Sequence, residues 1–143
     1  MREQEVKVLN EVYKGCEMGI EALDEILPKV YSEKFQMDLT GHKKDLKELK
    51  NEIEDYMERS NELPTDTGIW KELMLKGTTK WNLMMDPTTS HIAEMLIQGG
   101  NMGVITARKL LNESSNLDAF TKQLTEKFIR LEENNNEKMK QYL

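Results

Sequence analysis

Hydrophobic residues recur along this chain at alternating steps of three and four, the spacing that places side chains on one face of an α-helix. Four segments show this pattern, over about residues 3–27, 33–59, 87–112 and 117–142. We therefore predict four long amphipathic helices. The hydrophobic stripe of the first helix comprises Val6, Leu9, Tyr13, Cys16, Ile20, Leu23 and Leu27. That of the second comprises Phe35, Leu39, His42, Leu46, Leu49, Ile53 and Tyr56. That of the fourth comprises Leu117, Phe120, Leu124, Phe128, Leu131, Asn135, Met139 and Tyr142.

The third segment has a broader stripe that contains small residues. Glycines inside a helix weaken it by roughly 1 kcal/mol each relative to alanine, so we expect another helix to approach closely there. The helix should begin at Asp86-Pro87, since Asp is a good N-cap and Pro suits the first helical position. Its predicted stripe is Ile92, Met95, Leu96, Gly99, Met102, Ile105 and Leu110.

The faces opposite these stripes are strongly charged, as at Lys43-Lys44-Asp45 and Glu132-Glu133. A single helix of this kind is marginal in water, whereas four around a shared core are stable. We therefore predict an all-α fold in one domain, residues 1–143. It would be an antiparallel four-helix bundle of two helical hairpins, joined by a long crossover, residues 60–86, with a short extra helix.

The two hairpins show a loose internal similarity. The pattern Gly-x-x-Met-Gly occurs at Gly15–Gly19 and again at Gly99–Gly103. The pattern indicates a repeated hairpin. Chance matching of helical heptads is the alternative.

With this hairpin order, the chain resembles the ferritin-like four-helix-bundle superfamily. It also resembles a small bacterial ferritin-like family of unknown function. The residues that carry the second likeness are the pair Leu9-Asn10, the stretch Glu17-Met18-Gly19 and the segment Lys80-Trp81-Asn82-Leu83-Met84 before the third helix.

Ferritin-like enzymes bind two metal ions through a carboxylate from each of two helices and a Glu-x-x-His from each of the other two. The fourth segment here has no histidine, and the residue three before His42 is Leu39. The third segment has His91 and Glu94 in the reverse order. We therefore predict no catalytic, cofactor-binding or metal-binding residues, and no cofactor. The alternative is an atypical metal site near Glu17, Asp38, His42 and Glu94.

His42 occupies a core position of the second stripe, level with Cys16, Glu17 and Ile20 of the first helix. We interpret it as a core histidine, hydrogen-bonded to Glu17 or a nearby polar group, in preference to a metal ligand. Cys16 has no basic neighbour to lower its pKa, so we interpret it as a small buried hydrophobe.

Composition indicates the cellular location of the protein and argues against some classes of binding partner. The net charge is −6, which argues against a nucleic-acid or anionic-membrane partner. The single cysteine, the absence of an apolar N-terminal leader and the lack of a long apolar run favour a cytoplasmic protein. Trp70 and Trp81 could share one side of a helix as a patch for homodimerisation.

The favoured function is therefore a non-catalytic ferritin-like bundle that acts through protein interaction or as a structural component, as a homodimer or with another protein. A metal-binding oxidoreductase of the di-iron or di-manganese type is the alternative. A third hypothesis is a small-ligand carrier that uses the glycine-lined gap beside the third helix.

Overall fold

The computed structural model describes residues 1–65 and 88–143, and within them every regular element is a helix, so the predicted all-α class is confirmed. The predicted extra helix, Trp70, Trp81 and Asp86-Pro87 lie outside the described residues. The elements are α1 (Glu3–Ile26), a 3₁₀ turn η1 (Leu27–Lys29), α2 (Glu33–Arg59), α4 (Thr89–Glu113), α5 (Ala119–Met139) and a 3₁₀ turn η2 (Lys140–Tyr142).

Side-chain caps fix where three of these helices start. The Ser32 hydroxyl accepts a hydrogen bond from the Phe35 amide at 3.3 Å, and α2 begins at Glu33 as predicted. Thr88 caps α4 in the same way, so this helix begins at Thr89, two residues later than predicted. Asp118 caps α5, which starts at Ala119 instead of residue 117. Each hydroxyl or carboxylate binds an amide that the first helical turn leaves without a partner.

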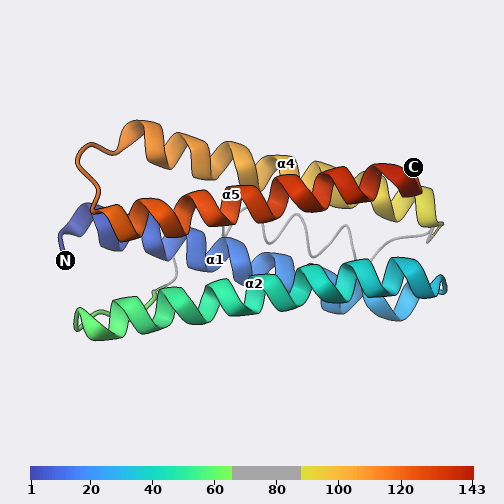
Figure 1. The fold of residues 1–143 in the computed structure, drawn as a ribbon, viewed down its shortest axis with the longest axis horizontal. Helices are drawn as coiled ribbons and strands as arrows, with labels where there is room; N and C mark the ends of the chain where they lie inside the picture. Colours follow the sequence, from blue (N-terminus) through green and yellow to red (C-terminus); the bar gives the residue numbers. More distant parts are fainter. Residues whose placement is uncertain (66–87) are drawn as a thin grey trace.

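The four helices lie lengthwise beside one another (Figure 1). α1 and α5 run in one direction, and α2 and α4 run in the opposite direction. The most extensive packing joins α4 to α5 and α1 to α2, and further contacts join α2 to α5 and α1 to both α4 and α5. All four helices therefore share one core.

The core of α2 matches its predicted stripe closely. Its large hydrophobic positions, from Phe35 to Ile53, are fully buried. In α1 the buried face is shifted toward Val8, Val12 and Ile26, while Tyr13 and Ile20 are only partly buried. The buried hydrophobic residues of these two helices are Val8, Leu9, Val12, Cys16, Leu23, Ile26, Phe35, Leu39, Leu46, Leu49, Ile53 and Met57.

The predicted stripe of α4 is wrong at three positions, because Gly99, Met102 and Ile105 are all exposed. Met102 is 45% exposed and Ile105 is 54% exposed. Gly100, Gly103 and Ala107 take their place inside. Small residues bring the backbone of α4 close to α5, as the glycines predicted, and the larger side chains then face outward.

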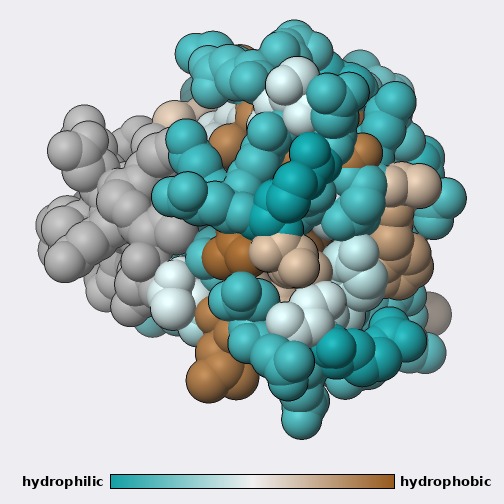
Figure 2. All heavy atoms as spheres, turned by 90° about the vertical axis from the view of Figure 1, so that its left-hand side faces the viewer, coloured by the Kyte–Doolittle hydropathy of each residue, from teal (hydrophilic) through white to brown (hydrophobic). Residues whose placement is uncertain are grey.

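Aromatic contacts join α2 to α5 and to the η2 turn that follows it. The rings of Phe35 and Tyr142 stack with their centroids 4.2 Å apart, and those of Tyr56 and Phe120 lie 4.6 Å apart. Phe120, predicted in the core, remains 38% exposed. Where α1 and α5 begin, hydrophilic side chains cover most of the end of the molecule, with smaller hydrophobic areas among them (Figure 2).

Candidate functional site

The most unusual feature of the core is a histidine–carboxylate pair that joins α2 to α5. His42 Nε2 lies 3.5 Å from Glu132 Oε1, and the two side chains are only 8% and 10% exposed. The prediction that His42 is a core histidine with a polar partner agrees with this geometry, but its partner is Glu132 and not Glu17. Glu132 was predicted on the charged outer face, which is wrong because its side chain points into the core.

The surroundings of Glu132 come from the other two helices. A Cβ added to Gly19 of α1 would lie 4.0 Å from Glu132 Oε1, and one added to Gly103 of α4 would lie 3.8 Å from Glu132 Cγ. These are the final glycines of the two Gly-x-x-Met-Gly stretches. Both copies of the pattern therefore meet at the same carboxylate, and all four helices contribute to the site.

Cys16 of α1 lies in the same region. Its thiol is buried, and burial raises its pKa, an effect that the nearby Glu132 carboxylate reinforces. A thiol in this state remains protonated at neutral pH and is a poor nucleophile. The prediction that Cys16 behaves as a small hydrophobe is consistent with these surroundings.

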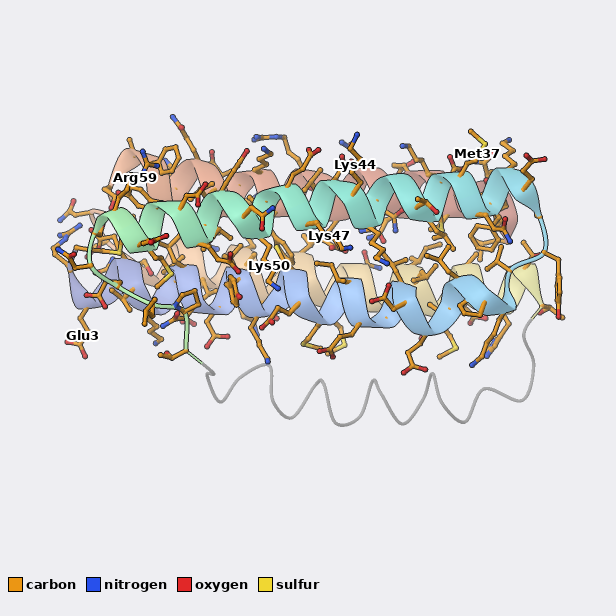
Figure 3. All side chains as sticks on the ribbon, turned by 90° about the horizontal axis from the view of Figure 1, so that it is seen from below. Glu3, Met37, Lys44, Lys47, Lys50 and Arg59 are labelled. Atoms are coloured by element: carbon orange, nitrogen blue, oxygen red, sulfur yellow. The ribbon has the colours of Figure 1, made fainter. Side chains whose placement is uncertain are left out.

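The other residues of the predicted atypical metal site are not brought together. Glu17 binds Lys14 at 3.5 Å and Lys50 at 3.6 Å, where Lys50 lies on the side of α2 that faces α1 (Figure 3). Asp38 accepts a hydrogen bond from the Tyr142 hydroxyl. Glu94 is exposed on α4. Among residues 1–65 and 88–143, no group of three or more His, Cys, Asp or Glu side chains is placed to hold a metal ion.

Two asparagines continue the polar surface of α5 beyond Glu132. Asn136 donates a hydrogen bond from Nδ2 to Asn101 Oδ1 of α4 at 2.9 Å. The Oδ1 atom of Asn135 is buried without a hydrogen-bond partner in the described part of the chain. Asn135 was predicted in the stripe, whereas Asn136 was not. Their spacing of three and four residues from Glu132 places all three on one helical face, but this spacing does not mark them as buried, because Glu132 itself stands in a charged stretch.

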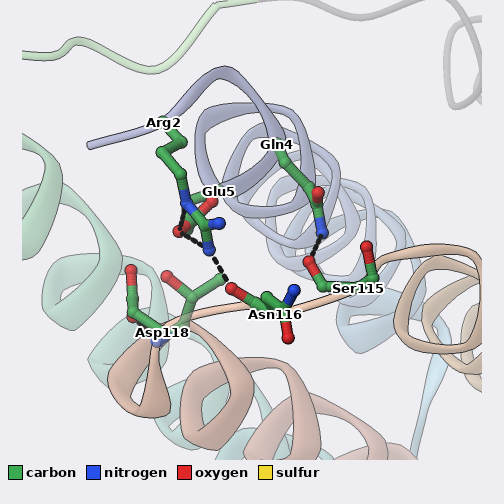
Figure 4. A network of polar contacts seen from close by, with 7 residues as sticks. Arg2, Gln4, Glu5, Ser115, Asn116 and Asp118 are labelled. Atoms are coloured by element: carbon green, nitrogen blue, oxygen red, sulfur yellow. Dashed lines mark hydrogen bonds and ion pairs between the residues drawn. The ribbon is translucent and has the colours of Figure 1, made fainter.

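A second polar network joins the start of α1 to the turn between α4 and α5 (Figure 4). Arg2 binds the carboxylate of Glu5 and donates a hydrogen bond to the carbonyl of Asn116. The Gln4 amide donates to the Ser115 carbonyl at 2.6 Å. These contacts satisfy backbone carbonyls of the turn, so the network is structural.

None of the described helices is long and apolar enough to cross a membrane. Comparison of the chain with protein-family models, with curated proteins and with solved structures finds no match. The resemblance to ferritin-like proteins therefore depends on the sequence pattern alone.

Proposed function

We propose that this chain is a non-catalytic ferritin-like four-helix bundle, in which two antiparallel hairpins form a scaffold that acts through protein interaction or as a structural component. The order of the helices, the hairpin repeat and the likeness to small bacterial ferritin-like proteins support this reading. A cytoplasmic location fits the lone cysteine, whose buried thiol needs no disulfide partner.

One observation carries the proposal. Metal sites in carboxylate bundles require inward-facing ligands from all four helices. At the level of Glu132, α1 and α4 present Gly19 and Gly103, whose lack of a side chain supplies no ligand. The space is used to hold one carboxylate against His42. At this level the bundle interior is thus built for packing around one buried polar pair.

Elemental analysis of the purified chain tests the proposal. We expect iron and manganese far below one ion per chain, and no ferroxidase or peroxidase rate after incubation with either metal. Two tightly bound ions per chain together with such a rate would overturn it.

A metal-binding oxidoreductase remains the second candidate, and the residues that favour it differ from the predicted set. His42 and Glu132 carry imidazole and carboxylate groups, each of which binds transition metals, and they lie 3.5 Å apart. If this candidate holds, metal content falls in His42→Ala and is unchanged in His91→Ala, which removes the other histidine of the chain. Unchanged metal content in both variants would exclude binding at this pair.

A further inference from the structure

The outer face of α4 differs from the outer faces of the other helices. Met102 and Ile105 are exposed there one turn apart, although hydrophobic side chains of this size usually turn inward. The charged residues of α4 are also few. Only Glu94, Arg108, Lys109 and Glu113 are charged among its 25 residues, whereas about half of the 27 residues of α2 are.

Depletion of charge together with exposed methionine is the compositional signal of a protein interface. The few charged side chains of α4 also support an interface there. Glu94, Arg108 and Lys109 are exposed, and none of them forms an ion pair within residues 1–65 and 88–143, whereas α1, α2 and α5 all contain ion-paired residues. Those three α4 side chains are therefore available to a partner.

The positions of Glu94 and Lys109 would bring opposite charges together if two copies of α4 packed antiparallel. Glu94 lies two turns before Asn101, and Lys109 lies two turns after Met102. At 1.5 Å per residue, each is therefore about 11 Å from the midpoint between Asn101 and Met102. A second copy of α4 packed antiparallel about a two-fold axis at this midpoint would place each Glu94 opposite the Lys109 of the other copy. The surface is thus complementary to itself in charge.

We propose that α4 is the surface through which two copies of this chain associate, with the two helices antiparallel, Met102 and Ile105 at the centre and Glu94–Lys109 pairs at both ends. The proposal rests on the proposed function, since it names the partner of a protein that works by interaction. The occupant of this face is a second copy because the charges at its two ends are opposite in sign and equally distant from its centre.

Sedimentation equilibrium of the full chain provides the first test. We expect the wild type to be dimeric and Ile105→Glu to be monomeric, since a buried glutamate without a partner opposes association. Met37→Glu is the matched control, because Met37 is 69% exposed on the outer face of α2 and lies outside α4 (Figure 3). It should remain dimeric. Circular dichroism verifies that both variants fold.

Charge-reversal variants test the antiparallel register of the two α4 helices. Glu94→Lys alone and Lys109→Glu alone each place like charges opposite each other at both ends, and we expect each to weaken dimerisation at least about tenfold. A one-to-one mixture of the two variants restores opposite charges at both ends, so it should form a heterodimer as stable as the wild type. A simple loss of folding or of helix stability would not be corrected by mixing.

Three results would overturn the proposal: a monomeric wild type at every concentration tested, a dimer that survives both Ile105→Glu and the single charge changes, or a mixture no more stable than its components. Each is separable from failure of the proposed function, which metal content and redox activity decide. A monomeric, metal-free chain would reject this surface and leave the non-catalytic role intact.

Discussion

The carboxylate of Glu132 and the imidazole of His42 depend on each other, because a polar group inside a packed core is costly unless it has a polar partner. Gly19 of α1 and Gly103 of α4 lie beside Glu132, where an added Cβ would first meet Leu46 at 2.7 Å and Phe128 at 3.5 Å respectively. Neither residue can be removed alone without leaving the other polar group buried.

Replacing His42 by alanine should therefore lower the free energy of unfolding by about 1–3 kcal/mol, as expected when a buried polar group loses its partner. The double variant His42→Leu/Glu132→Leu removes both polar groups and should lose less than the sum of the two single variants. Urea unfolding followed by circular dichroism measures all four proteins. Strict additivity would mean that the two side chains do not interact.

Asp118 links stability to pH. Burial tends to raise its pKa, but hydrogen bonds from Thr121 and Tyr56 outweigh this effect and hold the pKa below the ordinary value of 3.8. A folded pKa below the unfolded one stabilises the protein at neutral pH, and this contribution is lost as the pH falls from the unfolded value through the folded one.

We therefore expect Asp118→Asn to be less stable than the wild type at neutral pH, and the difference to shrink as the pH falls below the ordinary value of 3.8. Ser32→Ala, which removes an uncharged cap from α2, serves as the control, because its loss of stability should not vary with pH. Urea midpoints across this pH range give both comparisons. A constant difference for Asp118→Asn would contradict the assignment.

At the scale of the helix, Gly41 of α2 and Gly100 of α4 have opposite effects on stability. Gly41 is exposed, and an added Cβ would meet nothing within 4 Å. Gly100 is buried, and its added Cβ would lie 2.3 Å from Asn136 Oδ1. The first glycine only weakens its helix, whereas the second lets α5 pack closely.

We predict that Gly41→Ala raises the free energy of unfolding by about 1 kcal/mol, the difference in helix propensity. The same substitution at Gly100 should lower it by about 1–3 kcal/mol, because Asn136 must move and lose its hydrogen bond to Asn101. Thermal or urea unfolding measures both. A stabilising Gly100→Ala would show that α4 and α5 can separate without loss.

These two helices also show how far the fold could be predicted from the sequence. In α2 large apolar side chains occupy the core positions, so the spacing of Phe35, Leu39 and Leu46 identifies the buried face directly. In α4 the contacts are made by glycine and alanine, and a pattern based on hydrophobicity selects Met102 and Ile105 instead. Hydrophobic periodicity identifies the buried face of a helix only where the buried residues are also the large apolar ones.

The candidate site was predictable in part for a similar reason. His42 is a polar residue at a core position of the hydrophobic stripe, so its spacing identifies it as a buried polar residue. Glu132 stands beside Glu133 in a charged stretch, which is typical of a solvated face. Only the packing of the four helices shows that Glu132 is inside, where it is 8% exposed and meets His42. The sequence pattern has no means of showing which carboxylate a distant histidine meets.

For the whole molecule, the contacts between α2 and α5 predict cooperative unfolding. Phe35 and Tyr142 stack near one end of the pair, and Tyr56 and Phe120 near the other. Neither hairpin can therefore open without exposing the core of the other, so we expect a single two-state transition. Far-ultraviolet dichroism, which reports helix, and near-ultraviolet dichroism, which reports aromatic packing, should give the same midpoint. Separate midpoints would mean that the hairpins unfold independently.

The opposed directions of the helices have an electrical consequence. Among the described helices, α1 and α5 start at the end of the bundle where α2 and α4 finish (Figure 1). A helix start carries a partial positive charge of about one half and a helix end an equal negative one. The four macrodipoles therefore cancel along the long axis. The helix dipoles of the described bundle therefore add little field at either end, so any long-range attraction of a charged molecule must come from the charged side chains, whose net charge is −6.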